Sequence, residues 1–230
     1  MDALKLSDTP VTTPITTRGH GSRLSRHEAV LLATAPVILA LGRLTLVPFD
    51  DQEWDRMLSN MAADHSRNAV GWSLTLVAAA LLTIAGVVLV RLVPDRPRLT
   101  VPALVGVALG WVGTAAIASG GLVMGDMADS PERAAMVTTL TNYNEGNGNT
   151  VFFLVLAGVI GNILLAIALA RGGIASRGSA VLLGLGAVVS LVGAPGPVKA
   201  VAVTGAVLVF AAHLLIIRRL SGRNSVSVVA

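Results

Sequence analysis

Long apolar blocks with almost no charge are the feature that most restricts what this chain can fold into. A helix of about 20 apolar residues crosses the roughly 30 Å hydrocarbon core of a bilayer. Five blocks are long enough to cross: 29–49, 69–92, 101–124, 150–170 and 198–217. A sixth, shorter block at 179–194 is rich in glycine, so we expect a thin span, a tilted span or a re-entrant segment there.

The composition favours a membrane protein over a soluble one. Only 13% of the 230 residues are charged, whereas a soluble domain carries about 25%. Hydrophobic residues make up 53% of the chain, and the mean hydropathy is +0.74. Because these residues form continuous blocks, we predict an all-α, multi-pass helical bundle in the cell membrane, with the lipid bilayer as its surroundings.

The distribution of charge predicts the orientation of the chain. Lys and Arg accumulate in the short cytoplasmic loops of membrane proteins. Six spans with both termini in the cytoplasm place 12 of the 17 basic residues inside and nine of the 13 acids outside. If 179–194 did not cross, the basic segment RRLSGR would face outward, so we predict six spans. The inner basic residues are Lys5, Arg18, Arg23, Arg26, Arg91, Arg96, Arg98, Arg171, Arg177, Arg218, Arg219 and Arg223.

Polar segments flank a six-helix domain that we place at 28–218. We predict that residues 1–27 form a flexible cytoplasmic tail and that residues 219–230 form a second cytoplasmic tail. No small-residue cleavage site follows the first apolar block, so we expect a retained first helix and not a signal peptide.

Two long outer loops, 50–68 and 125–149, have helical features of their own. In the first loop, apolar residues recur at helical spacing, so a short helix could lie on the bilayer surface or cap the bundle. In the second loop, Ser130 and Pro131 are suited to the start of a helix. The apolar residues of the first loop are Trp54, Met57, Leu58 and Met61.

Small residues at every fourth position of the third block predict close helix packing. Helices in lipid associate through close van der Waals contact, which Gly, Ala, Ser and Thr permit. The fourth block carries Gly158 and Gly161 in a weaker pattern of the same kind. The stripe in the third block is Gly106, Gly110, Thr114 and Ala118.

Arg43 lies inside the first apolar block, about 9 Å along the helix axis from its outer end. One interpretation is that the long side chain reaches to the interface and leaves its charge in water. The other is that Arg43 points into the bundle and pairs with Asp51, Asp55 or Asp126, closing the outer mouth of a cavity.

The acidic outer loops provide a candidate polar site at the outer face. Carboxylates bind hard cations, so a metal or diphosphate site is one hypothesis. The spacing matches no metal-ligand motif, however, and we favour a solvated acidic loop as the interpretation. We therefore predict no metal. The candidate residues of this face, besides Arg43, are Asp51, Asp55, His65, Asp126 and Glu145.

Two further polar residues lie well inside apolar blocks. We expect Asn162 to join two helices, with a contact to a substrate or ion as the alternative, because an amide in hydrocarbon needs a partner. We expect His213 to be a polar helix contact. A single deep histidine argues against a haem held by two axial ligands, so we predict no cofactor.

These observations leave three functional hypotheses. The leading one is a non-catalytic accessory component that docks another membrane protein or a second copy of the chain. The second is a small transporter or channel, with Arg43, Asn162 and the outer acids along its path. The third, less favoured, is an enzyme acting on a lipid or isoprenoid at the outer face. The absence of cysteine excludes thiol chemistry, and scattered basic residues argue against nucleic acid as a partner.

Overall fold

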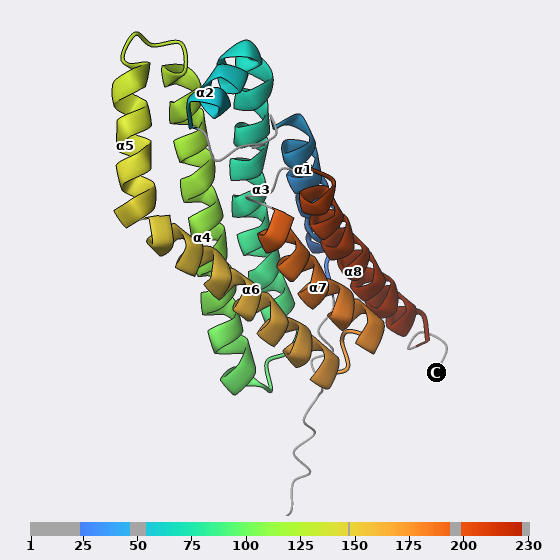
Figure 1. Ribbon diagram of the computed structural model, residues 1–230. Coiled ribbons are helices and arrows are strands. Elements are labelled where there is room, and N and C mark those ends of the chain that lie inside the picture. Colours follow the sequence, from blue (N-terminus) through green and yellow to red (C-terminus); the bar gives the residue numbers. More distant parts are fainter. Residues whose placement is uncertain (1–23, 47–53, 147, 194–198, 227–230) are drawn as a thin grey trace, which may run out of the picture.

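The computed structural model describes residues 24–46, 54–146, 148–193 and 199–226. These residues form eight α-helices and contain no strand, which confirms an all-helical chain (Figure 1). Five of the helices are long and apolar enough to cross a membrane, and α7 is a shorter apolar helix. They fit a multi-pass membrane protein. The helices are α1 (Arg26–Thr45), α2 (Trp54–Ala63), α3 (His65–Arg91), α4 (Pro97–Met127), α5 (Arg133–Gly146), α6 (Gly148–Arg171), α7 (Arg177–Gly193) and α8 (Lys199–Val226).

Several helices are longer than the apolar blocks that predicted them. α4 extends beyond its block at both ends, and α3 begins four residues before the predicted 69. α8 continues to Val226, so most of the expected C-terminal tail is helical. The expected N-terminal tail, apart from residues 24–27, lies outside the described part of the chain.

Local sequence explains where the helices begin and turn. Ser25 Oγ accepts a hydrogen bond from the Glu28 amide at 3.2 Å, and the Ser25 amide donates to Glu28 at 2.9 Å. This capping box satisfies amides that the first helical turn leaves without partners. Pro97 occupies the first turn of α4, where the missing N–H costs nothing. Gly173 has a φ of 71° in the α6–α7 turn, a conformation that favours glycine.

Six helices form a closed ring around one axis. α4 packs between α3 and α6, and α1 packs between α3 and α8. α7 contacts both α6 and α8 and so completes the ring in the same layer as the longer helices (Figure 1). In this arrangement each helix has two neighbours, and the remaining face of each is exposed.

Glycines set the distance between α4 and α6. A methyl group added to Gly106 would lie 2.7 Å from the Gly161 Cα atom, and one added to Gly110 would overlap the Cα atom of Gly158. The backbones of the two helices are therefore in contact at both levels. This finding confirms the predicted role of the small-residue stripe.

One end of the bundle carries a cap, which we define as α2, α5 and the adjoining ends of α3 and α4. In Figure 1, α2 lies over the upper ends of α3 and α4, and α5 runs beside the upper part of α4. Met57, Leu58 and Met61 of α2 are buried against Trp72 and Ala118. Of the two positions expected for α2, the structure therefore shows the one in which it covers the bundle. We call this end the cap end.

At the opposite end of the ring, most of the charged residues are arginines, and we call this end the basic end. The described acids there are Glu28, which pairs with Arg91 at 3.2 Å, and Asp95. The arginines of the basic end within the described residues are Arg26, Arg91, Arg96, Arg98, Arg171, Arg177, Arg218, Arg219 and Arg223.

Candidate functional site

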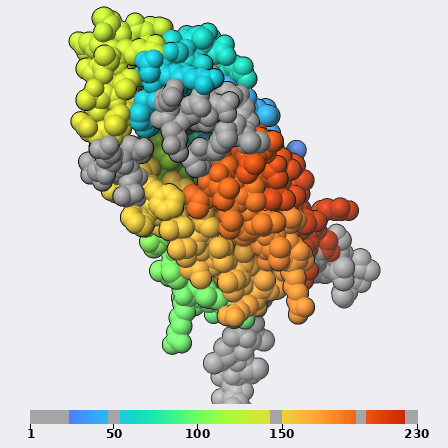
Figure 2. Space-filling model, viewed as in Figure 1, coloured from blue at the N-terminus to red at the C-terminus, as the bar shows by residue number. Residues whose placement is uncertain are grey.

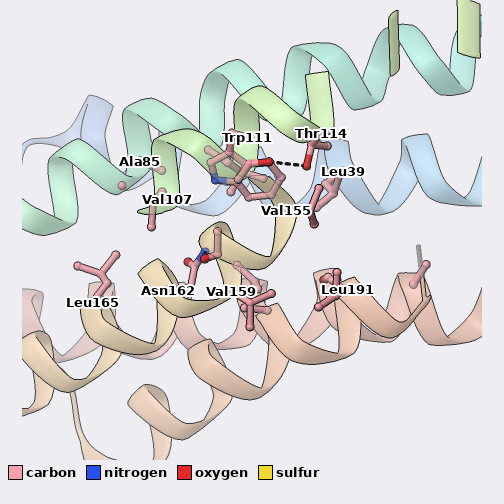
Figure 3. A pocket seen from close by; sticks show the side chains of 18 of the residues that line it. Leu39, Ala85, Val107, Trp111, Thr114, Val155, Val159, Asn162, Leu165 and Leu191 are labelled. Atoms are coloured by element: carbon pink, nitrogen blue, oxygen red, sulfur yellow. Dashed lines mark hydrogen bonds between the residues drawn. The ribbon is translucent and has the colours of Figure 1, made fainter. Parts of the chain in front are cut away.

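The ring encloses a cavity of about 90 Å³ to which all six of its helices contribute. Most of its surface is apolar. Figure 3 shows Asn162 and Leu165 of α6 on one side of the cavity, with Val107 and Trp111 of α4 on the other. Arg43, Asn162 and His213 all line it. Three polar residues that the sequence places in three separate apolar blocks therefore share one cavity.

The face of α1 on which Arg43 lies explains how its side chain reaches the cavity. Leu32, Pro36 and Leu39 are buried and precede Arg43 at intervals of three or four residues, so the four residues share one helix face. The opposite face is exposed. Its large exposed residues are Val30, Val37, Leu41 and Leu44. Arg43 thus continues the inward face of α1, and its side chain lines the cavity, as in the second of the two interpretations.

The acids expected to pair with Arg43 bind elsewhere or lie outside the described residues. Asp55 forms an ion pair with Arg133 of α5 at 2.9 Å. Asp126 is 78% exposed and lies 3.7 Å from His65 Nε2. Asp51 is outside the described part of the chain. Among the residues that the structure describes, Arg43 has no hydrogen bond or ion pair, and its charge faces a largely apolar cavity.

Asn162 makes its hydrogen bond within its own helix. Its Nδ2 atom donates to the Gly158 carbonyl at 2.9 Å, so this bond does not join two helices as expected. No described residue donates to its Oδ1 atom. Because Gly158 and Gly161 hold α6 against α4, the same close packing fixes the depth of Asn162 in the cavity.

His213 connects α8 to α1 through the Leu32 carbonyl, which Pro36 leaves without its usual helical hydrogen-bond donor. In an α-helix, the Leu32 carbonyl would accept from the amide of residue 36, but residue 36 is proline and has no N–H. His213 Nδ1 lies 2.7 Å from that carbonyl oxygen. Since a carbonyl only accepts, Nδ1 must carry the proton. The neutral ring then leaves Nε2 as an acceptor.

The outer-face candidates do not converge on a cavity. His65 lies at the start of α3, with Nδ1 3.1 Å from the Gly125 carbonyl, and its partner Asp126 is exposed. Asp55 joins α2 to α5 through Arg133. Glu145 lies in α5, and its side chain is outside what the structure describes. Within the described residues, no group of three or more His, Asp or Glu side chains could hold a metal ion.

Sequence reasoning missed two residues of interest. Trp111 lines the central cavity opposite α6 (Figure 3). Asn68, beneath the cap, is only 1% exposed, and neither atom of its amide has a hydrogen-bond partner among the described residues. The spacing of Asn68 from His65 and Trp72, three and four residues, is the available signal, because it places all three on one helix face.

Comparison with known proteins does not assign this chain to a family. No protein-family description, no curated protein and no solved structure matches it. Its function must therefore be inferred from the cavity and from the distribution of charge on the bundle.

Proposed function

We propose that this chain is a six-span protein of the cell membrane that binds a small organic anion in its central cavity. The observation that carries the proposal is that Arg43, Asn162 and His213, from three different helices, line one cavity inside a closed ring. Ionisable residues within membrane segments are rare and usually functional, because burying a charge in hydrocarbon is costly.

Three features support six spans with both termini in the cytoplasm. α7 belongs to the same ring as the five long helices. Its 17 residues give a length of about 25 Å, enough for a thin or tilted span. The basic end holds nine described arginines and two described acids, which is the charge bias of a cytoplasmic face.

An introduced-cysteine experiment tests this topology, because the chain has no cysteine of its own. Residues 67 and 177 are exposed at the cap end and the basic end, respectively. In intact cells, we expect a membrane-impermeant maleimide to label Arg67→Cys and to label Arg177→Cys only after the membrane is opened. Labelling of both variants from outside would contradict the six-span orientation.

The lining of the cavity indicates the class of ligand. Arg43 supplies a cation with several N–H donors, and a carboxylate is a geometrically suited partner for a guanidinium. The rest of the lining is mainly apolar, so the body of the ligand should be apolar as well. A volume of 90 Å³ is smaller than the ~150 Å³ cavity that accommodates benzene. We therefore propose a short-chain carboxylate.

Transport is a second candidate function, favoured by the spread of polar residues along the axis. Leu32, which binds His213, and Arg43 are 11 residues apart on α1. That separation corresponds to about 16 Å along the helix axis. Polar contacts at both depths, with Asn162 on the facing helix, would give an anion more than one binding position across the bundle.

The other two hypotheses have less support. For an enzyme, the candidate acids of the cap end would have to surround a cavity, and Asp55 and Asp126 are exposed. The accessory hypothesis relied on the outer-loop helices or the small-residue stripe as the docking surface, and Gly106 and Gly110 of the stripe are buried against α6. Partner docking through the exposed face of α5 remains compatible with anion binding.

Carboxylate binding by purified protein tests the proposed ligand. We expect a series of straight-chain monocarboxylates, from acetate to octanoate, to raise the melting temperature in mild detergent, with an optimum at a short chain. Arg43→Gln should weaken binding about 10- to 100-fold, which corresponds to loss of a hydrogen-bonded charge pair of about 1.5–3 kcal/mol. Arg43→Lys should retain part of the affinity.

Arg67→Gln is the matched control. Arg67 lies at the cap end, is exposed, and pairs at 3.6 Å with Asp64, the residue just before α3. This variant should bind carboxylates as the native chain does. If no carboxylate stabilises the native protein, or if Arg43→Gln binds as well as Arg67→Gln, the proposed ligand class is wrong.

A further inference from the structure

An apolar groove, separate from the central cavity, lies between α6 and α7. It has a volume of about 480 Å³, within the range of small-molecule sites. Ile163 and Ile167 of α6 and Val181 and Gly184 of α7 line it. The three large residues are each between 37% and 64% exposed, so the groove opens to the outside of the ring. Figure 2 shows α6 and α7 side by side on the face in view.

Two arginines close the basic end of this groove. Arg171 is the last residue of α6 and Arg177 is the first residue of α7, and both line the groove. Both are exposed, and neither side chain forms an ion pair with another described residue. A row of apolar side chains therefore ends at two available positive charges.

The neighbouring side chains increase the positive charge at this point. Arg96 donates to the Arg171 carbonyl at 3.0 Å, and Arg219 donates to the Gly173 carbonyl at 3.3 Å. The two described acids of the basic end do not neutralise the groove arginines. Glu28 is paired with Arg91, and Asp95 forms no ion pair with Arg171 or Arg177.

We infer that this groove binds an anionic phospholipid. One acyl chain lies between α6 and α7 against Ile163, Ile167 and Val181, and the phosphate group lies between Arg171 and Arg177. Basic pockets between membrane helices at the cytoplasmic side bind anionic lipid headgroups for the same reasons of charge and shape. The site is independent of the proposed carboxylate site, because Arg43 is on α1 and near the cap end.

The occupant is a lipid and not a soluble anion because of how the groove is built. Its apolar length faces the side of the bundle that a bilayer would surround, where an acyl chain is already present. A soluble phosphate would use only the arginine pair. A zwitterionic lipid would fill the apolar part, but the ammonium group of its headgroup would lie close to a cluster of guanidinium groups, and its net charge of zero would balance none of their charge.

Lipid retention by the purified full-length chain tests the inference. The protein is incubated in mild detergent with equal amounts of phosphatidylglycerol and phosphatidylcholine, and retained lipid is measured by native mass spectrometry. We expect at least a tenfold preference for phosphatidylglycerol. Arg171→Gln combined with Arg177→Gln should reduce that preference at least tenfold, while retention of phosphatidylcholine stays the same.

Two further variants separate charge from shape. Gly184→Leu should lower retention of both lipids, because a methyl group at Gly184 meets only Ile163, at 3.8 Å, and the longer side chain would occupy the groove. Arg98→Gln combined with Arg218→Gln removes the same charge from exposed positions of the basic end that do not line the groove. This control should keep the native preference.

Three outcomes would overturn the inference. The first is an equal loss of preference in the control pair and the groove pair, which would mean that net charge alone attracts the lipid. The second is displacement of bound phosphatidylglycerol by millimolar inorganic phosphate, which would identify a site for a soluble anion. The third is no preference in the native protein. Arg43→Gln should leave lipid retention unchanged, so failure of the carboxylate proposal is measured separately.

Discussion

Replacing Gly110 with leucine should prevent stable assembly of the bundle. Any Cβ atom at this position would overlap the Gly158 backbone on α6. Neither backbone can move aside as a flexible side chain would, so α4 and α6 would have to separate. The cost should exceed the ~1–3 kcal/mol typical of overpacked side chains. We expect loss of monodisperse protein after detergent extraction, measured by size-exclusion chromatography and thermal melting.

Gly120→Leu is the control for this variant. Gly120 is on the same helix, and an added methyl group there would meet no atom within 4 Å. The same exchange should therefore leave yield and melting temperature close to those of the native protein. A Gly110→Leu protein as stable as the Gly120→Leu protein would show that α4 and α6 are not in backbone contact.

The contact at Gly110 also matters for the cavity. Gly158 and Gly161 lie four residues and one residue before Asn162 on α6, and Gly113 contacts Leu154 and Val155, about one turn before Gly158 on the same helix. A shift of α6 would therefore move one wall of the proposed carboxylate site. Milder substitutions, such as Gly106→Ala, provide a way to relate helix separation to binding.

Hydropathy was sufficient to predict the long apolar helices, but not their exact ends. A hydropathy pattern ends where charged residues begin, whereas a helix ends where its backbone finds another partner. α4 includes Arg98 at one end and Asp126 at the other, because neither residue prevents helical hydrogen bonding. The sequence therefore located the apolar helices more reliably than it located the boundaries of those helices.

The arrangement of the helices could not be predicted from periodicity. Helices that are apolar on all sides give no indication of which face meets a neighbour. The position of Arg43 illustrates this limit, because apolar residues surround it on α1 and only the structure shows that Leu39 is buried while Leu41 and Leu44 are exposed. Long-range pairing was also missed. Asp55 binds Arg133, 78 positions away in sequence.

The link between Pro36 and His213 is a further example, since the two residues lie in the first and last ring helices. Pro36 leaves the Leu32 carbonyl without its helical donor, and His213 supplies the donor at 2.7 Å. In hydrocarbon, an unsatisfied carbonyl cannot turn to water. The Leu32 carbonyl therefore depends on His213 for a donor because residue 36 is proline.

This dependence predicts energetic coupling between the two positions. In the native background, His213→Leu should destabilise the protein by about 1–3 kcal/mol, the cost of leaving a buried polar group unpaired. In a Pro36→Ala background, the new amide of residue 36 can donate to the Leu32 carbonyl. The same His213→Leu change should then cost much less, because the carbonyl keeps a partner.

A double-mutant cycle measures this coupling through the free energy of unfolding in a mild membrane mimetic. We expect an interaction energy of about 1–2 kcal/mol between positions 36 and 213, which is within the range for residues that share a contact. Pro102→Ala is the control. Pro102 lies in the second turn of α4, so the carbonyl that it leaves without a donor is that of exposed Arg98. Its effect should add to that of His213→Leu. Additivity at Pro36 as well would mean that His213 does not replace the missing amide, and its place in the cavity would then need a different explanation.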